Sequence, residues 1–395
     1  MRDELALAKA EQACQILGEL DLDLWLVFVR ETDGMADPAL SLAFRGSAVW
    51  PAALLYGRDG LRTAIVGRFD ADGLPDGLFH RVVPYDRGIQ AALVGELRRR
   101  NPRTIAINVS PSDAAADGLT AGMRDVLEKG LAGTPYRNRL TSSENLLARL
   151  RGRKLPAEIA RIRRAVEITE SILARVLLQT RVGETERSIY HRFRDEMTSC
   201  GVTAAWAEAH DPAVDAGPDK RLGHGGATEN RVRDGHLLHV DFGVRADGYC
   251  SDLQRMVFFG TSADVPEEVE RAFGAVAGAI EVSSRALRPG VRGREVDEVA
   301  RSYIRDRGYP EFLHALGHQV GQSAHDGGAL LGPPWERYGD SVEREVEEGN
   351  VFTLELHVPT TGFGGMSLEE DVLVTKGGCE YLSTPQRELW CVEGG

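Results

Sequence analysis

Several features are scarce or missing in this sequence of 395 residues, and each absence excludes a class of protein. The five cysteines are widely spaced and include no C-x-x-C pair, which argues against a disulfide scaffold and favours a reducing compartment. The most apolar stretches, such as residues 24–29, are far too short to cross a bilayer. The first 140 residues contain no strand–G-x-G-x-x-G–helix unit, so a nucleotide loop is not expected there.

Positive charge is also in short supply. The chain has 47 basic and 60 acidic residues, a formal net charge of −13. Such a surface repels nucleic acid and anionic lipid, so neither is expected as a partner. The N-terminal 15 residues carry acids and no long apolar core, which predicts no secretory signal and a cytoplasmic protein.

The length of the chain favours two domains. Residues 1–148 alternate short apolar runs with amphipathic segments, which predicts a small α/β domain. The expected strands are 23–29, 52–57, 63–69 and 104–110, and the expected helices are 4–19 and 89–100.

A basic linker precedes the second region, 149–395. Pro156 suits the first turn of a helix, and apolar residues at helical spacing follow it. Two further helices, 267–287 and 293–307, lie between strand-like blocks. This half is therefore predicted to be an α+β domain.

Two aspartates lie on a predicted hairpin at 237–260. If the turn is centred between Ala246 and Asp247, Asp241 faces Asp252 directly. If Asp247 and Gly248 form a two-residue loop, Asp241 faces Gln254 and Asp252 is diagonal to it. Both registers place the two carboxylates on one face of a mostly buried hairpin, where they need a cation or another partner.

Two glutamates repeat this arrangement further on. Glu355 lies in an apolar strand, and a turn centred near Gly362 would bring Glu369 opposite to it. Glu370 and Asp371 are interpreted as solvent-facing residues or as supporting groups behind the ligands.

The glycine-rich segment 314–328 adds three histidines. His318 is flanked by Gly317 and Gly321, whose lack of side-chain bulk allows a close approach to a metal. His314 is interpreted as a supporting or structural histidine. Four carboxylates and one imidazole are enough to hold two divalent ions, which can activate water to cut an amide bond.

The motifs HVDFGVRADGYCSDLQR, LGHQVGQSAHD, VFTLELHV and LEEDVLVT resemble those of the pita-bread metallopeptidases. This group includes Xaa-Pro aminopeptidases, Xaa-Pro dipeptidases, methionine aminopeptidases and the metal-free creatinases. The resemblance is strong from about residue 150 to 395. It implies a pita-bread catalytic domain at 149–395, and an N-terminal domain of the prolidase and creatinase type at 1–148.

The resemblance also implies roles for individual residues. Two ions would share a hydroxide that attacks the scissile carbonyl. The implied metal ligands are Asp241, Asp252, His318, Glu355 and Glu369, with Asp252 and Glu369 bridging both ions. His325 would stabilise the oxyanion, Glu355 would carry the proton, and His224 would assist proton transfer.

Two positions depart from the family pattern. Many proline-specific members have arginine two residues before the bridging glutamate, where this chain has Ser367. The usual E-P-G is here Glu355-Leu356-His357. Both departures are interpreted as changes on the substrate side, away from the metal ligands.

The expected function is hydrolysis of an N-terminal Xaa-Pro bond in dipeptides or short peptides, by a homodimer. The oxygen-rich ligand set suits manganese or cobalt, with zinc or iron also compatible, and the resemblance favours manganese. The alternative is a small-molecule amide or amidine hydrolase on the same fold, like a creatinase or an ectoine hydrolase. A binding protein with an inactive site is the third reading, disfavoured by the intact ligand set.

Overall fold

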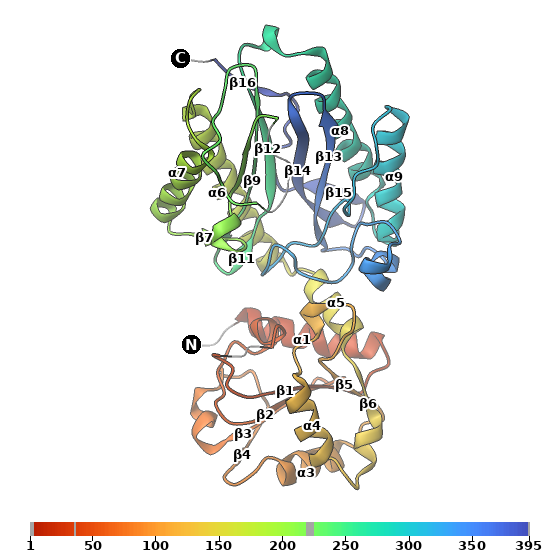
Figure 1. The fold of residues 1–395 in the computed structure, drawn as a ribbon. Helices are drawn as coiled ribbons and strands as arrows, with labels where there is room; N and C mark the ends of the chain where they lie inside the picture. Colours follow the sequence, from red (N-terminus) through yellow and green to blue (C-terminus); the bar gives the residue numbers. More distant parts are fainter. Residues whose placement is uncertain (1–3, 35–36, 219–224, 394–395) are drawn as a thin grey trace. The chain divides into compact units, whose positions relative to one another are not determined.

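The computed structural model describes residues 4–34, 37–218 and 225–393 (Figure 1). The chain divides into two compact units, Met1–Arg151 and Gly152–Gly395. Among the described residues, no helix combines the length and apolar character needed to cross a membrane.

The first unit contains one sheet of six strands in the order β4-β3-β2-β1-β5-β6. Its strands are β1 (Leu24–Val29), β2 (Ala52–Gly57), β3 (Arg62–Gly67), β4 (Arg81–Tyr85), β5 (Ile105–Ile107) and β6 (Leu140–Ser142). Its α-helices are α1 (Glu4–Glu19), α2 (Leu40–Ala43), α3 (Gln90–Arg100), α4 (Ala121–Gly130) and α5 (Glu144–Gly152).

The central strand of this sheet, β1, is buried along its whole length because helices cover both faces. Trp25 packs in one core cluster with Ile16 of α1. Leu26, which points the opposite way, packs in a second cluster with Leu97 of α3. A continuous apolar run therefore forms this strand, as expected for a sheet buried on two sides.

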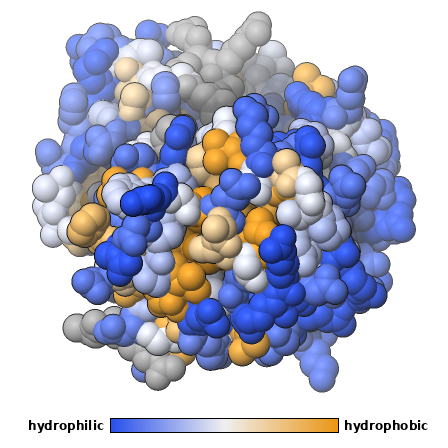
Figure 2. Space-filling model, turned by 90° about the horizontal axis from the view of Figure 1, so that it is seen from below, coloured by the Kyte–Doolittle hydropathy of each residue, from blue (hydrophilic) through white to orange (hydrophobic). Residues whose placement is uncertain are grey.

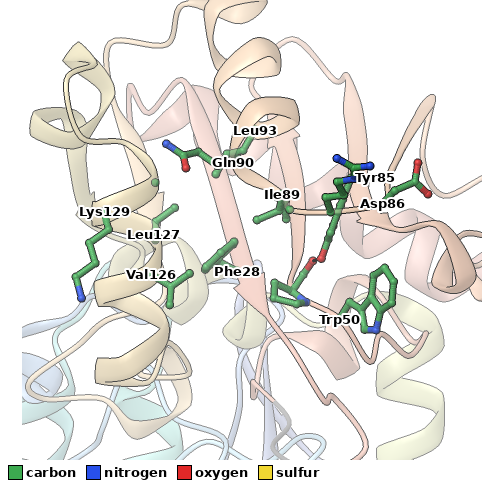
Figure 3. Close-up of a pocket in the computed structure, with 14 residues that line it drawn as sticks. Phe28, Trp50, Tyr85, Asp86, Ile89, Gln90, Leu93, Val126, Leu127 and Lys129 are labelled. Atoms are coloured by element: carbon green, nitrogen blue, oxygen red, sulfur yellow. Dashed lines mark hydrogen bonds between the residues drawn. The ribbon is translucent and has the colours of Figure 1, made fainter.

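This unit also has a hollow of about 580 Å³ (Figure 3). Phe28 and Leu93 lie among its apolar lining, and Trp50, Asp86 and Lys129 also line it. Apolar side chains also gather in the middle of the face seen in Figure 2, surrounded by hydrophilic ones. Of the residues implicated by the sequence in metal binding or catalysis, none of the six that the structure describes lines the hollow.

The second unit is built around a larger sheet in the order β13-β14-β12-β9-β8, with β15 paired to β14 and β16 to β12. A separate sheet of three strands has the order β11-β10-β7. The strands of the unit are β7 (Thr203–Ala204), β8 (Ala213–Ala216), β9 (Leu237–Phe242), β10 (Val244–Ala246), β11 (Tyr249–Cys250), β12 (Leu253–Phe259), β13 (Val351–Thr360), β14 (Gly364–Thr375), β15 (Gly378–Tyr381) and β16 (Trp390–Val392). Its α-helices are α6 (Pro156–Gln179), α7 (Glu186–Cys200), α8 (Glu267–Ala286) and α9 (Gly293–Asp306).

Helix α8 packs against β13 and β14, and α9 packs beside α8 (Figure 1). Val276 and Ile280 of α8 share a core cluster with Leu354, Leu356 and Leu368 of the two strands. Since side chains alternate along a strand, residues 355 and 369 point to the other face of the sheet. The helices therefore fix the sheet from one side and leave the opposite face for polar groups.

Candidate metal centre

The β-hairpin that carries the two aspartates turns through a two-residue loop. Ala246 pairs with Tyr249, so Asp247 and Gly248 form the loop, and both have positive φ (50° and 80°). This is the combination that a tight hairpin turn requires. The second of the two predicted registers is confirmed: Asp241 faces Gln254.

The pairing of the glutamates is also as predicted. Glu355 of β13 lies directly opposite Glu369 of β14. Glu369 in turn pairs with Gln254 of β12, and Gln254 pairs with Asp241 of β9. Four neighbouring strands thus place Asp241, Gln254, Glu369 and Glu355 in one row across the sheet.

The imidazole of His318 lies above this row. Its Nε2 is 3.6 Å from Glu355 Oε1 and 3.9 Å from Glu369 Oε1. The same nitrogen is 3.8 Å from Asp252 Oδ2. One ligand atom each from Asp252, His318 and Glu369 lies within 4.8 Å of the others, a spacing that suits a shared metal ion.

Local backbone structure sets the direction of the His318 ring. Its Nδ1 lies 3.1 Å from the carbonyl oxygen of Ala324, which accepts the Nδ1 proton and leaves the Nε2 lone pair facing the carboxylates. A Cβ atom at Gly317 would lie only 1.9 Å from the Thr353 carbonyl oxygen. Glycine therefore allows the histidine segment to pack closely against β13.

Burial of so many acids changes their protonation. Burial, with the nearby charge of Asp241, raises the pKa of Glu355 to about 8. Burial and mutual repulsion raise the pKa values of Asp252 and Glu369 well above their ordinary range. Burial, with His325 nearby, lowers the pKa of His318 to about 3, so this imidazole is neutral and able to donate a lone pair.

These residues fit a divalent cation. Glu369 Oε1 is buried without a hydrogen-bond partner and faces the lone pair of His318. Several carboxylates sharing one buried space are stable as anions only when a cation offsets their repulsion. Asp241 lies outside the group of three, but its charge acts on the pKa of Asp252, Glu355 and Glu369.

Two further histidines, His325 and His224, were assigned catalytic roles by the resemblance. The ring of His325 meets that of His318 edge to face, with centroids 4.2 Å apart, and His325 is exposed. Its neighbour Asp326 forms a buried ion pair with Lys154 at 3.1 Å. His224 lies outside the described residues.

The acids that follow Glu369 do not face solvent, so that part of the prediction was wrong. Glu370 is buried and pairs with Arg255 at 3.0 Å. Asp371 is buried as well, and its Oδ2 accepts the backbone N–H of Asp252 at 3.1 Å. Both act instead as supporting groups, the other half of the interpretation. Their hydrogen-bond donors are the Arg255 guanidinium of β12 and the backbone N–H of Asp252, just before β12.

Sequence reasoning missed a buried chain of hydrogen bonds on the same face as the carboxylates. Gln254 donates through Nε2 to Glu355 and Glu369. Its Oε1 lies 2.9 Å from His239 Nε2, whose Nδ1 lies 3.0 Å from Asp215 Oδ2. Burial opposes the charged form of His239, but the Asp215 carboxylate raises its pKa overall.

The interpretation of Ser367 as a purely substrate-side residue also needs correction. Its hydroxyl donates to Gln254 Oε1 at 2.6 Å, so it reaches the glutamates through one side chain. The ring of His357 stacks on that of His314, and a hydrogen bond of 3.0 Å joins His357 Nδ1 to His314 Nε2. The spacing of the sequence could have indicated the missed residues. His239 and Gln254 are each two positions from an aspartate, so each shares the strand face of that aspartate.

Comparisons with known proteins agree with this arrangement. The sequence profile of metallopeptidase family M24 matches residues 160–376. An Xaa-Pro dipeptidase of Pyrococcus furiosus is 30% identical over 250 residues, covering 62% of this chain and 67% of that protein. A second, from Pyrococcus horikoshii, is 29% identical over 60% of this chain and 64% of its own length, slightly less than two thirds.

A solved structure resembles the chain over almost its full length. The X-Pro aminopeptidase of Thermotoga maritima superposes with a TM-score of 0.72 at 25% identity, covering 97% of this chain and 99% of that one. The profile match spans more than half of the chain and includes the whole carboxylate row. The candidate metal ligands thus lie within the region that matches the family profile, and the chain belongs to metallopeptidase family M24.

Proposed function

We propose that this metallopeptidase hydrolyses the bond between an N-terminal residue and a following proline, in dipeptides or short peptides. The observation that carries the proposal is the meeting of Asp252, Glu355 and Glu369 around the neutral imidazole of His318. The names of the relatives, Xaa-Pro dipeptidase and X-Pro aminopeptidase, support the substrate class.

The ligands we propose are the five residues Asp241, Asp252, His318, Glu355 and Glu369. Two divalent ions bound there would polarise the scissile carbonyl and supply a water of lowered pKa. Manganese is our proposal for the metal, since oxygen-rich ligation with one nitrogen suits it, and cobalt, zinc and iron remain compatible.

The protein's own side chains would move the proton and stabilise the developing charge. We propose Glu355 as the group that takes up the proton and returns it. Its pKa of about 8 is that of the metal-free protein, and a bound cation would lower it. We propose that His325 donates to the oxyanion, which its exposure and its ring contact with His318 support. A proton-transfer role for His224 is proposed on the resemblance alone.

We also propose the setting in which this activity occurs. The first unit is proposed to be an N-terminal domain of the prolidase and creatinase type, spanning residues 1–148. The catalytic domain would then cover 149–395, and the protein would act as a homodimer. All five cysteines lie in the described residues and none is bonded to another, which supports a reducing, cytoplasmic setting.

A panel of small substrates with added Mn²⁺ tests the proposal. It consists of Xaa-Pro dipeptides, Xaa-Pro tripeptides, matched Xaa-Ala dipeptides and creatine. We expect cleavage of the Xaa-Pro members and little cleavage of the Xaa-Ala controls. Cleavage of creatine with no Xaa-Pro turnover would overturn the proposal in favour of a small-molecule hydrolase.

A further inference from the structure

One neutral side chain lies within the row of acids across the sheet. Gln254 lies between Asp241 on one neighbouring strand and Glu369 on the other. It is only 7% exposed, so its amide must find its hydrogen-bond partners inside the protein. The apolar core lies on the opposite face of the sheet, so the partners of this amide must be the polar groups on its own face.

All the hydrogen-bonding capacity of this amide is used. Nε2 donates to Glu355 Oε2 at 3.1 Å and to Glu369 Oε2 at 2.8 Å. Oε1 faces the Ser367 hydroxyl at 2.6 Å and His239 Nε2 at 2.9 Å. Once a metal ion is bound, the two glutamates would be ionised and could only accept hydrogen bonds, so the NH₂ group must be the end of the amide that faces them.

The two carboxylate oxygens of each glutamate therefore have different partners. Oε2 of both carboxylates is held by Gln254. Oε1 of both faces His318 Nε2, at 3.6 Å for Glu355 and 3.9 Å for Glu369. One amide thereby sets the rotation of two carboxyl groups and presents one oxygen of each to the same point.

The outer end of the chain fixes the amide itself. His239 lies between Gln254 and Asp215, at 2.9 Å and 3.0 Å, and both residues are buried with it. Ser367 approaches the same amide oxygen from strand β14. Donors from two neighbouring strands thus stop the amide from turning away from the glutamates.

We propose that Gln254 is a positioning residue that orients Glu355 and Glu369 for metal binding, with Ser367, His239 and Asp215 holding it in place. The inference rests on the proposed metal-binding role of the two glutamates. Groups that hold metal ligands from behind affect both the affinity for the ion and the geometry around it. Gln254 itself need not touch the ion or the substrate.

The test compares Gln254→Met with Gln386→Met by calorimetric titration with Mn²⁺. Methionine keeps the length of glutamine but removes its hydrogen bonds. Gln386 is the matched control, because it is also buried in this unit but bonds to the backbone of Met256 and Glu388. We expect Gln254→Met to weaken Mn²⁺ binding roughly 10- to 100-fold, and Gln386→Met to lower thermal stability alone.

A spectroscopic readout separates positioning from general stability. The visible absorption of bound Co²⁺ reports the ligand geometry, and it should change in Gln254→Met but not in Gln386→Met. Ser367→Ala removes one of the two donors to the amide oxygen, so its effect should have the same direction and a smaller size. It also provides the test if Gln254→Met does not fold.

Unchanged Mn²⁺ affinity and an unchanged Co²⁺ spectrum in both Gln254→Met and Ser367→Ala would overturn this inference. The proposed function would survive that result if the wild type still binds metal and cleaves Xaa-Pro peptides. A wild-type protein that binds no divalent metal would instead contradict the proposed function.

Discussion

Glu355 and Glu369 lie opposite each other on neighbouring strands, with their side chains on the same face of the sheet. Glu369 is buried and Glu355 is partly buried among further acids, and this loss of solvent raises the pKa of each. Two carboxylates in this arrangement repel each other, so either protons or metal ions must occupy the space between them. Protons and metal ions therefore compete for the space between the two glutamates.

The acidic run of strand β14 should separate metal binding from stability. Glu369→Ala is expected to abolish turnover and lower metal content, because it removes an oxygen that faces His318. Glu370→Ala should instead destabilise the fold by about 3–5 kcal/mol, since it removes the nearer and buried carboxylate partner of Arg255 and leaves only Glu170, at 3.9 Å. Metal analysis and thermal unfolding of both variants measure the difference. The reverse pattern would show that the register assigned to the ligand is wrong.

His325 should matter for turnover and little for metal binding. Replacing it with alanine removes a proposed donor to the oxyanion, an effect worth roughly 10²–10³-fold in kcat. Metal content should stay close to that of the wild type, because His318 supplies the imidazole nitrogen that faces the carboxylates. Steady-state kinetics on a metal-loaded sample gives the answer. A loss of stability with kcat unchanged would mark His325 as structural.

The metal-free protein should lose stability as the pH rises. The pKa of Glu355 is about 8 in the folded protein, and the unfolded chain titrates glutamate at about 4.3. Between these values the folded state keeps a proton that the unfolded state has lost, so the free energy of unfolding falls with rising pH. This contribution is fully present below about pH 4 and is lost as the pH rises through about 8.

Thermal melts with EDTA and with Mn²⁺, at several values from about pH 5 to 8, test this dependence. A bound cation replaces the proton, so stabilisation by Mn²⁺ should grow as the pH increases. Curves with and without metal that run parallel over this range would contradict the prediction.

Much of the fold follows from patterns that depend on near neighbours in the sequence. The helix predicted at 4–19 is α1 with the same bounds, and the strand predicted at 52–57 is β2. Helix α7 was not predicted. Its buried residues Ile189, Phe193 and Met197 recur every four positions, but charged residues dominate the rest of the helix. Its buried stripe was therefore too narrow to stand out by composition.

In the candidate site, too, the features that depend on near neighbours in the sequence were predictable and the contacts between distant segments were not. Alternation along single strands was enough to place Glu355 opposite Glu369 and to limit the aspartate hairpin to two registers. Contacts between distant strands were not accessible from spacing. Ser367 and Gln254 are 113 positions apart, and only the order of β14 and β12 in the sheet brings them together.

The most direct test of the whole account measures bound metal and Xaa-Pro hydrolysis in the same samples, for the wild type and for Asp252→Ala. We expect wild-type activity to rise as Mn²⁺ is added to metal-free protein and to level off at about two ions per chain. Asp252→Ala should bind less metal and remain inactive, since Asp252 Oδ2 lies 3.8 Å from the imidazole nitrogen at the centre of the site. Full Mn²⁺ loading of Asp252→Ala, or undiminished hydrolysis by the metal-free wild type, would contradict the account.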